Sequence, residues 1–212
     1  MTIDEAGSVP GSALGRARAA ALAELRRRPV AVSWRRDAAR TLLAVLGTTA
    51  LVVGVGTWVS IMEPGRLGER WLQVALLVAL QSLGVFAAIA PGRAALRWTG
   101  ALLAVAAVAA VLIGRGVGVS HAAPEIVCSG SHLAIDLIPL GLVLYSLRRF
   151  SWSLGRATLA GAAVAATGAI AGELGCARGW MHALIYHLGA GVVIVAACVL
   201  ISRALRPQTF AP

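Results

Sequence analysis

The chain has 212 residues, of which 58% are apolar and only 13% are charged, and its formal net charge is +10. Soluble domains carry about 25% charged residues, so this composition indicates an integral membrane protein. All 19 basic residues are arginines, and they concentrate between the apolar runs. Such clustering is typical of membrane topology signals, and we expect no nucleic-acid binding.

Six apolar runs are long enough to cross a bilayer, because about 20 helical residues span its core of about 30 Å. They are predicted at residues 41–62, 71–90, 98–119, 132–147, 157–175 and 180–204, and the fourth can begin earlier, near Ile126. The sequence thus predicts an all-α integral membrane protein built as a six-transmembrane-helix bundle. Its expected parts are a basic cytoplasmic N-terminal segment (1–40), the transmembrane domain (41–204) and a short cytoplasmic tail (205–212).

The distribution of arginine predicts the orientation of this bundle. With the N-terminus inside, 15 of the 19 arginines fall on the inner side, in agreement with the positive-inside rule. An even number of spans then places both termini in the cytoplasm. We therefore expect a multi-pass protein of the bacterial inner membrane.

The N-terminal segment favours a helix over residues 14–28, which are rich in alanine, leucine, glutamate and arginine, and Pro29 ends it. One interpretation is a basic segment that lies on anionic lipid. The other is a helix that folds on a cytoplasmic partner protein. The residues predicted to bind this partner are Leu14, Leu22, Leu25, Arg26, Arg27, Arg28 and Trp34.

A GxxxG step, Gly168 and Gly172, lies in the fifth apolar run. Small residues at this spacing let neighbouring helix backbones approach closely. We interpret the step as packing within the bundle, with a homodimer interface as the alternative.

All four histidines and two of the three cysteines fall into two short segments, 121–132 and 173–187, both predicted at the outer side. Cys128 and Cys176 form an expected pair, whereas Cys198 is predicted near the inner face as a core residue. A disulfide between the pair is one interpretation. The other is a site for Zn²⁺ or another soft metal ion, although the spacing is not that of a zinc finger. The candidate ligands are Cys128, His132, Cys176, His182 and His187, with His121 the weakest candidate. The sequence indicates no other cofactor.

Three further ionisable residues form a predicted internal polar network: Arg115, Asp136 and Glu173. Charges inside a membrane cost at least a few kcal/mol and usually face the bundle interior in pairs. Arg115 is expected to pair with Asp136 or Glu173 as a structural ion pair. The alternative is a polar site that senses protons, metal or redox state. Asp136 shares one helix face with His132, which precedes it by four residues.

The arrangement resembles the NrsF-type membrane anti-sigma factors, to which the CarR-like proteins are a related comparison. The resemblance rests on the six spans, the basic N-terminal segment and a length of 212 residues. Its most specific elements are a cysteine near the third-to-fourth helix connection and another in the last hairpin, matched by Cys128 and Cys176. Residues 180–187 match the aromatic and histidine-bearing start of the last helix, and Ala177 stands where these proteins often have proline.

This resemblance implies a membrane-bound negative regulator that sequesters an extracytoplasmic-function sigma factor. The sigma factor would be released when the outer Cys/His site senses metal or redox stress. The competing hypothesis is a small membrane metalloprotein or enzyme that uses the outer Cys/His/Asp cluster. We do not expect an enzyme, because no complete catalytic constellation can be assembled from these residues.

Overall fold

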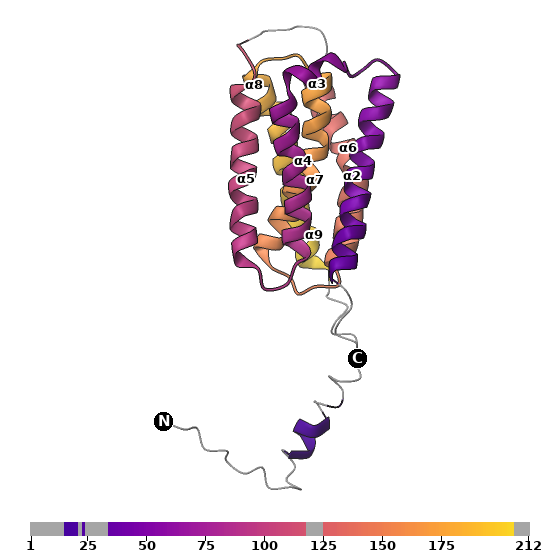
Figure 1. The fold of residues 1–212 in the computed structure, drawn as a ribbon, viewed down its shortest axis with the longest axis vertical. Coiled ribbons are helices and arrows are strands. Elements are labelled where there is room, and N and C mark those ends of the chain that lie inside the picture. The colour runs from indigo at the N-terminus through magenta and orange to yellow at the C-terminus, as the bar shows by residue number, and fades with distance from the viewer. Residues whose placement is uncertain (1–14, 21–22, 24–33, 118–124, 206–212) are drawn as a thin grey trace. The chain divides into compact units, whose positions relative to one another are not determined.

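The computed structural model describes residues 15–20, 23, 34–117 and 125–205 (Figure 1). The chain divides into two compact units, Met1–Trp34 and Arg35–Pro212. In the first unit, residues 15–20 are helical. The helices from Trp34 onward are α2 (Trp34–Trp58), α3 (Gly65–Glu69), α4 (Trp71–Ile89), α5 (Ala94–Ile113), α6 (Glu125–Leu147), α7 (Leu154–Gly175), α8 (Trp180–His182), the π-helix η1 (Ala183–Leu188) and α9 (Gly189–Ala204).

Six of the described helices are long and apolar enough to cross a membrane, with α8, η1 and α9 together forming the last one. This confirms the prediction of an all-helical, multi-pass bundle. α2 begins and α9 ends at the same end of the bundle, which we call the N/C end (Figure 1). The opposite end carries α3 and α8, and we call it the α3–α8 end. The cytoplasmic location of the N/C end stays a prediction.

Two helices, α2 and α5, differ most in extent from the apolar runs that predicted them. α2 begins at Trp34, before the predicted residue 41, because its charged first turns continue the helix beyond the apolar stretch. α5 ends at Ile113, where Gly114 caps it, rather than at residue 119. Gly114 and Gly116 each disfavour a continued helix by about 1 kcal/mol relative to alanine, and hydropathy alone does not register this cost. α6 begins at Glu125, close to the earlier of the two predicted starts.

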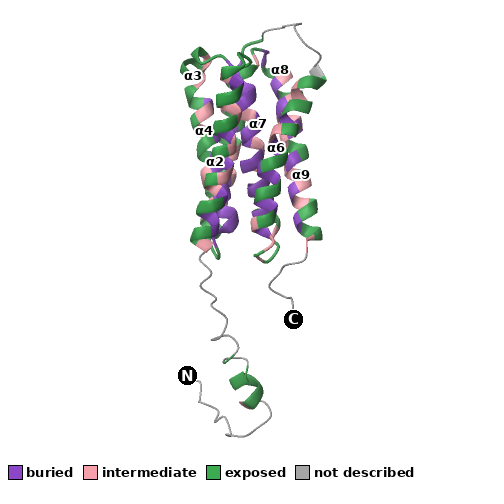
Figure 2. Ribbon diagram, turned by 90° about the vertical axis from the view of Figure 1, so that its right-hand side faces the viewer, coloured by how far each residue is buried: buried purple, intermediate pink, exposed green. Residues whose placement is uncertain are grey.

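α7 is the central helix, and its membrane-spanning window is 78% buried, more than that of any other described span (Figure 2). Alanine and glycine dominate its sequence, so α4, α6 and α9 can pack closely around it. At Gly161, for example, an added Cβ would lie 2.8 Å from the Cα of Val195 on α9. The Ser153 side chain caps the start of α7 by accepting a hydrogen bond from the Arg156 backbone N–H.

α2 is the exception to this close packing, because its backbone does not run near that of any other described helix. Polar side chains make much of its contact with the bundle. The hydroxyl oxygens of Thr41 and Ser146 lie 2.6 Å apart, and the Gln81 amide donates to the Thr49 hydroxyl at 2.8 Å. α2 is therefore held to the other described helices by side-chain contacts rather than by close backbone packing.

An ion pair holds the first turn of α2 at the N/C end. The Arg149 guanidinium, between α6 and α7, lies 3.1 Å from the Asp37 carboxylate. A hydrogen bond with Tyr145 and the charge of Asp37 raise the pKa of Arg149 above its ordinary value. The guanidinium therefore stays charged at any physiological pH.

Candidate metal centre

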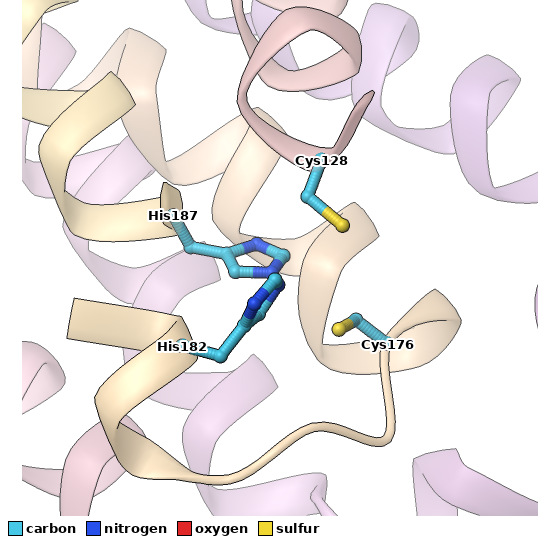
Figure 3. A group of neighbouring side chains, drawn as sticks. All are labelled: Cys128, Cys176, His182 and His187. Atoms are coloured by element: carbon cyan, nitrogen blue, oxygen red, sulfur yellow. The ribbon is translucent and has the colours of Figure 1, made fainter. Parts of the chain in front are cut away.

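Four sulfur and imidazole ligands meet at the α3–α8 end. Cys128 lies in the first turns of α6, Cys176 caps the end of α7, His182 ends α8 and His187 lies in η1. Their ligand atoms all lie within 4.8 Å of one another, and the side chains point toward a common centre (Figure 3). The two segments singled out in the sequence therefore come together in the fold.

This geometry is close to that of a zinc site. With Zn–S bonds of about 2.3 Å and Zn–N bonds of about 2.0 Å, the ligand atoms of a tetrahedral site are roughly 3.3–3.8 Å apart. All four ligand atoms already lie within 4.8 Å of one another, so only small side-chain movements separate this arrangement from tetrahedral coordination. Two thiolates and two imidazoles form a donor set that suits Zn²⁺ and softer ions such as Cd²⁺.

The π-helix η1 brings the two histidines of this group together. His182 and His187 are five residues apart, and on an α-helix that spacing separates two side chains by about 140° around the axis. In a π-helix, residue i bonds to residue i+5, so such residues lie nearly above one another. The Gly189 N–H indeed donates to the Leu184 carbonyl, five residues earlier. The two imidazole rings consequently lie only 5.2 Å apart between centroids.

His132 lies behind this group rather than in it. Its Nε2 is 2.7 Å from Nδ1 of His187, and the two rings meet edge to face. That contact orients the His187 ring, whose Nε2 is buried and has no hydrogen-bond partner among the described residues. A buried imidazole nitrogen held in this way is a suitable metal ligand. The structure thus supports His132 as a partner of a ligand, whereas the sequence predicted it to be a ligand.

The GxxxG step makes the space that these rings occupy. A Cβ added to Gly168 would lie 2.7 Å from Nδ1 of His132. A Cβ added to Gly172 would lie 2.8 Å from Nε2 of His132 and closer still to Nδ1 of His187. Both glycines therefore pack inside the bundle, against α6 and η1.

A buried ion pair fixes the end of α7 beside Cys176. Arg115 Nη2 lies 2.7 Å from Glu173 Oε1, and both side chains are almost completely buried. Arg115 also donates to the backbone carbonyls of Gly172 and Arg178. The guanidinium therefore holds α7 and the loop that leads from Cys176 to α8.

Comparison with known proteins identifies the chain. It is 38% identical over 205 residues to the carotenogenesis protein CarR of Myxococcus xanthus, and the alignment covers 95% of this chain and 91% of CarR. The chain belongs to the CarR-like family. The family resemblance drawn from the sequence is thereby confirmed. No family model and no solved structure matches this CarR-like chain.

The internal polar network of the CarR-like chain divides into two parts. Arg115 pairs with Glu173, one of the two predicted partners, and Arg70 adds a second contact to Glu173 at 3.3 Å. Asp136 is separate, because its Oδ1 accepts the backbone N–H of Gly168 at 2.9 Å. The sequence did not reveal Arg70 as a member of this network, since it lies at the edge of an apolar run.

Other predicted residues have different outcomes. Cys198 is fully buried on α9, as expected for a core residue. Trp34 is the first residue of α2. The remaining candidates lie outside the described residues: Leu14, Leu22, Leu25, Arg26, Arg27, Arg28 and His121.

Sequence reasoning missed two contacts beside the candidate metal centre, which is the group of Cys128, Cys176, His182 and His187. Arg178 Nη1 lies 3.4 Å from Nδ1 of His182, and the Ser129 hydroxyl donates to the Tyr186 carbonyl in η1. The only available signal was the position of Ser129 beside Cys128 and of Arg178 two residues after Cys176. Neither position is informative without the fold, which brings the start of α6 against η1 and places Arg178 beside His182 at the start of the last span.

The variant Gly172→Ala tests how closely this CarR-like fold is built around the centre. We expect Zn²⁺ affinity to fall about 10–100-fold, the usual effect of disturbing the groups that orient a metal ligand. Isothermal titration of purified protein with Zn²⁺ measures the change. Gly191→Ala on α9 is the matched control, because its Cβ would meet its nearest neighbour at an ordinary 3.5 Å. Unchanged affinity in Gly172→Ala would contradict the orienting role of the His132–His187 contact.

Proposed function

We propose that the chain is a membrane-bound negative regulator, an anti-sigma factor, and not an enzyme. In this proposal it sequesters an extracytoplasmic-function sigma factor at the cytoplasmic face of the inner membrane. The Cys/His centre releases that partner when it senses metal or redox stress. The observation that carries the proposal is the relation to CarR over 95% of the chain, because it extends far beyond any single span.

The arrangement of the bundle supports different roles for its two ends, with partner binding at the N/C end and sensing at the α3–α8 end. The N-terminal segment, which carries the predicted partner-binding residues, leads directly into α2 at the N/C end. The centre lies at the α3–α8 end. A signal must therefore pass along the bundle, and α2 is the span that continues the N-terminal segment.

The far end of α2 is connected to the centre. In the loop after α2, the Glu63 N–H donates to the Leu174 carbonyl at 3.3 Å, two residues before Cys176. The side chain of Met62 is buried in the same region. A shift of the end of α7 would therefore be passed to α2, which side-chain contacts rather than close backbone packing hold to the bundle.

Both candidate chemistries would produce such a shift. As metal ligands, Cys128 and Cys176 would bind as thiolates and draw together with His182 and His187 around the ion. As a disulfide, the same two sulfurs would approach to about 2.05 Å, with the two thiol protons and two electrons passing to an oxidant such as a peroxide, which is reduced to water or alcohol. Either event draws the start of α6 toward the end of α7. Local chemistry of this kind can bias an element that has two stable positions.

The proposal predicts that the full-length protein retains a sigma factor at the membrane and that the N-terminal segment is required. We expect the extracytoplasmic-function sigma factor encoded nearest to this gene to co-purify with the full chain after co-expression. Deletion of residues 1–33 should abolish co-purification while α2 to α9 still insert in the membrane.

A Cys198→Ala variant is the matched control, since this buried residue belongs to neither end of the proposed switch and should retain the partner. Failure of the full-length protein to retain the sigma factor under resting conditions would overturn the anti-sigma proposal.

A further inference from the structure

A lateral cleft opens between α2 and the two helices α6 and α7, in the half of the bundle nearest the α3–α8 end. Its volume is about 640 Å³, within the range of about 300–1,000 Å³ that is usual for small-molecule sites. Leu51 and Val55 of α2 line one side together with Val59 just after it, and Ile135 of α6 contributes to the same cleft. The cleft exists because α2 stands away from its neighbours.

The metal centre forms the inner end of this cleft. Cys128, Cys176 and His187 all contribute to its wall, together with His132. The buried nitrogens His187 Nε2 and His132 Nδ1, on these two wall residues, have no hydrogen-bond partner in the described part of the chain. The two thiols and the rings of His132 and His187 therefore face a cleft that opens at the side of the bundle.

The position of the cleft determines what can fill it. From Leu51 to the end of α2 at Trp58 the helix rises about 10 Å, so the cleft extends well into the membrane-spanning part of α2. The flanking side chains are apolar and open to the surroundings, with Leu51 65% and Val127 55% exposed. In the hydrocarbon region of a bilayer no water is present to solvate such a surface. At this depth of the bilayer, the molecules available to fill the cleft are the acyl chains of the surrounding lipids.

We propose that this cleft binds the acyl chain of a membrane phospholipid and that the bound chain covers the thiols of the metal centre. Lipid binding itself does not depend on the proposed function. The regulatory consequence of lipid binding does rest on the proposed function. The bound acyl chain separates α2 from α6 and so sets the position of α2, the span that continues the N-terminal segment. Apolar thiol reagents dissolved in the bilayer then reach Cys128 through the cleft, whereas charged reagents are hindered.

Photolabelling of the full-length protein tests the binding site. The probe is a phosphatidylcholine with a diazirine on one acyl chain, incorporated in vesicles of phosphatidylethanolamine and phosphatidylglycerol. We expect labels to be enriched several-fold on residues 51–59 and 127–135 relative to the exposed face of α5, as mapped by mass spectrometry. Labels spread evenly over all lipid-facing helices would overturn the proposal, as would cross-links between two copies of the chain at the cleft.

A cleft-filling variant sharpens the test. Ile135→Trp should reduce labelling of the cleft several-fold and slow the reaction of Cys128 with N-ethylmaleimide. Val105→Trp on α5 is the matched control, because Val105 is 68% exposed and lies outside the cleft. Equal reactivity of Cys128 in the unchanged protein toward N-ethylmaleimide and a charged methanethiosulfonate would show a water-filled crevice and overturn the proposal. None of these measurements uses a sigma factor, so their failure is distinct from failure of the anti-sigma proposal.

Discussion

The double variant Cys128→Ser, Cys176→Ser should lose metal binding at the centre and leave the regulator unresponsive to metals and oxidants. Structural zinc sites bind with about 10–16 kcal/mol, so loss of two of four ligands should weaken Zn²⁺ binding by roughly a thousandfold or more. Titration with Co²⁺ measures the loss directly, since thiolate ligation gives an absorption band that serine cannot produce. A sigma-dependent reporter measures the response in cells.

The control for this experiment is the third cysteine. Cys198→Ala removes a thiol from the core of α9, away from the centre, and should leave both Co²⁺ binding and reporter induction unchanged. Normal induction of the reporter by metals and oxidants in the double variant would contradict a sensor role for Cys128 and Cys176. Normal Co²⁺ binding by the same variant would contradict their assignment as metal ligands.

Arg115→Ala should destabilise the bundle by about 3 kcal/mol or more, because it leaves the Glu173 carboxylate buried without its closest cation. Arg70, at 3.3 Å from the other carboxylate oxygen, offsets part of this cost. The free energy of unfolding is measured by denaturant titration of the protein in detergent micelles. The same variant should weaken Zn²⁺ binding, since Arg115 also holds the loop that joins Cys176 to α8.

Two further variants distinguish the loss of the buried ion pair from nonspecific destabilisation of the fold. Arg66→Ala breaks an exposed ion pair with Glu63 and should cost at most about 1 kcal/mol. Replacing Arg115 and Glu173 together by methionine removes both buried charges and should cost less than Arg115→Ala alone. A double variant less stable than the single variant would contradict the account of Glu173 as an uncompensated buried charge.

The sequence predicted the spans and the two Cys/His segments well, because both depend on local composition. Twenty apolar residues must cross the bilayer whatever their neighbours are, and the runs behind α4 and α9 show this clearly. Cys128 and Cys176 were expected to lie at one edge of the bundle because the helices between them were counted correctly.

Relations between helices were not predictable in the same way. Arg115 could pair with Asp136 or Glu173, and only the packing of α5 against α7 decides in favour of Glu173. His132 looked like a ligand because it lies four residues after Cys128, but the fold directs its Nε2 to His187 instead. The central place of α7 follows from its small residues, whose partners are unknown until the bundle is assembled.

The π-helix at the start of the last span also bears on how such centres are found and copied. Searches for metal sites on helices look for histidines three or four residues apart, and a pair separated by five is passed over. In η1 one additional residue per turn is what brings His182 and His187 to the same face. A protein engineer who transplanted this centre onto an ordinary α-helix would have to delete one residue between the histidines, and a natural deletion there would convert the π-turn into a regular helix.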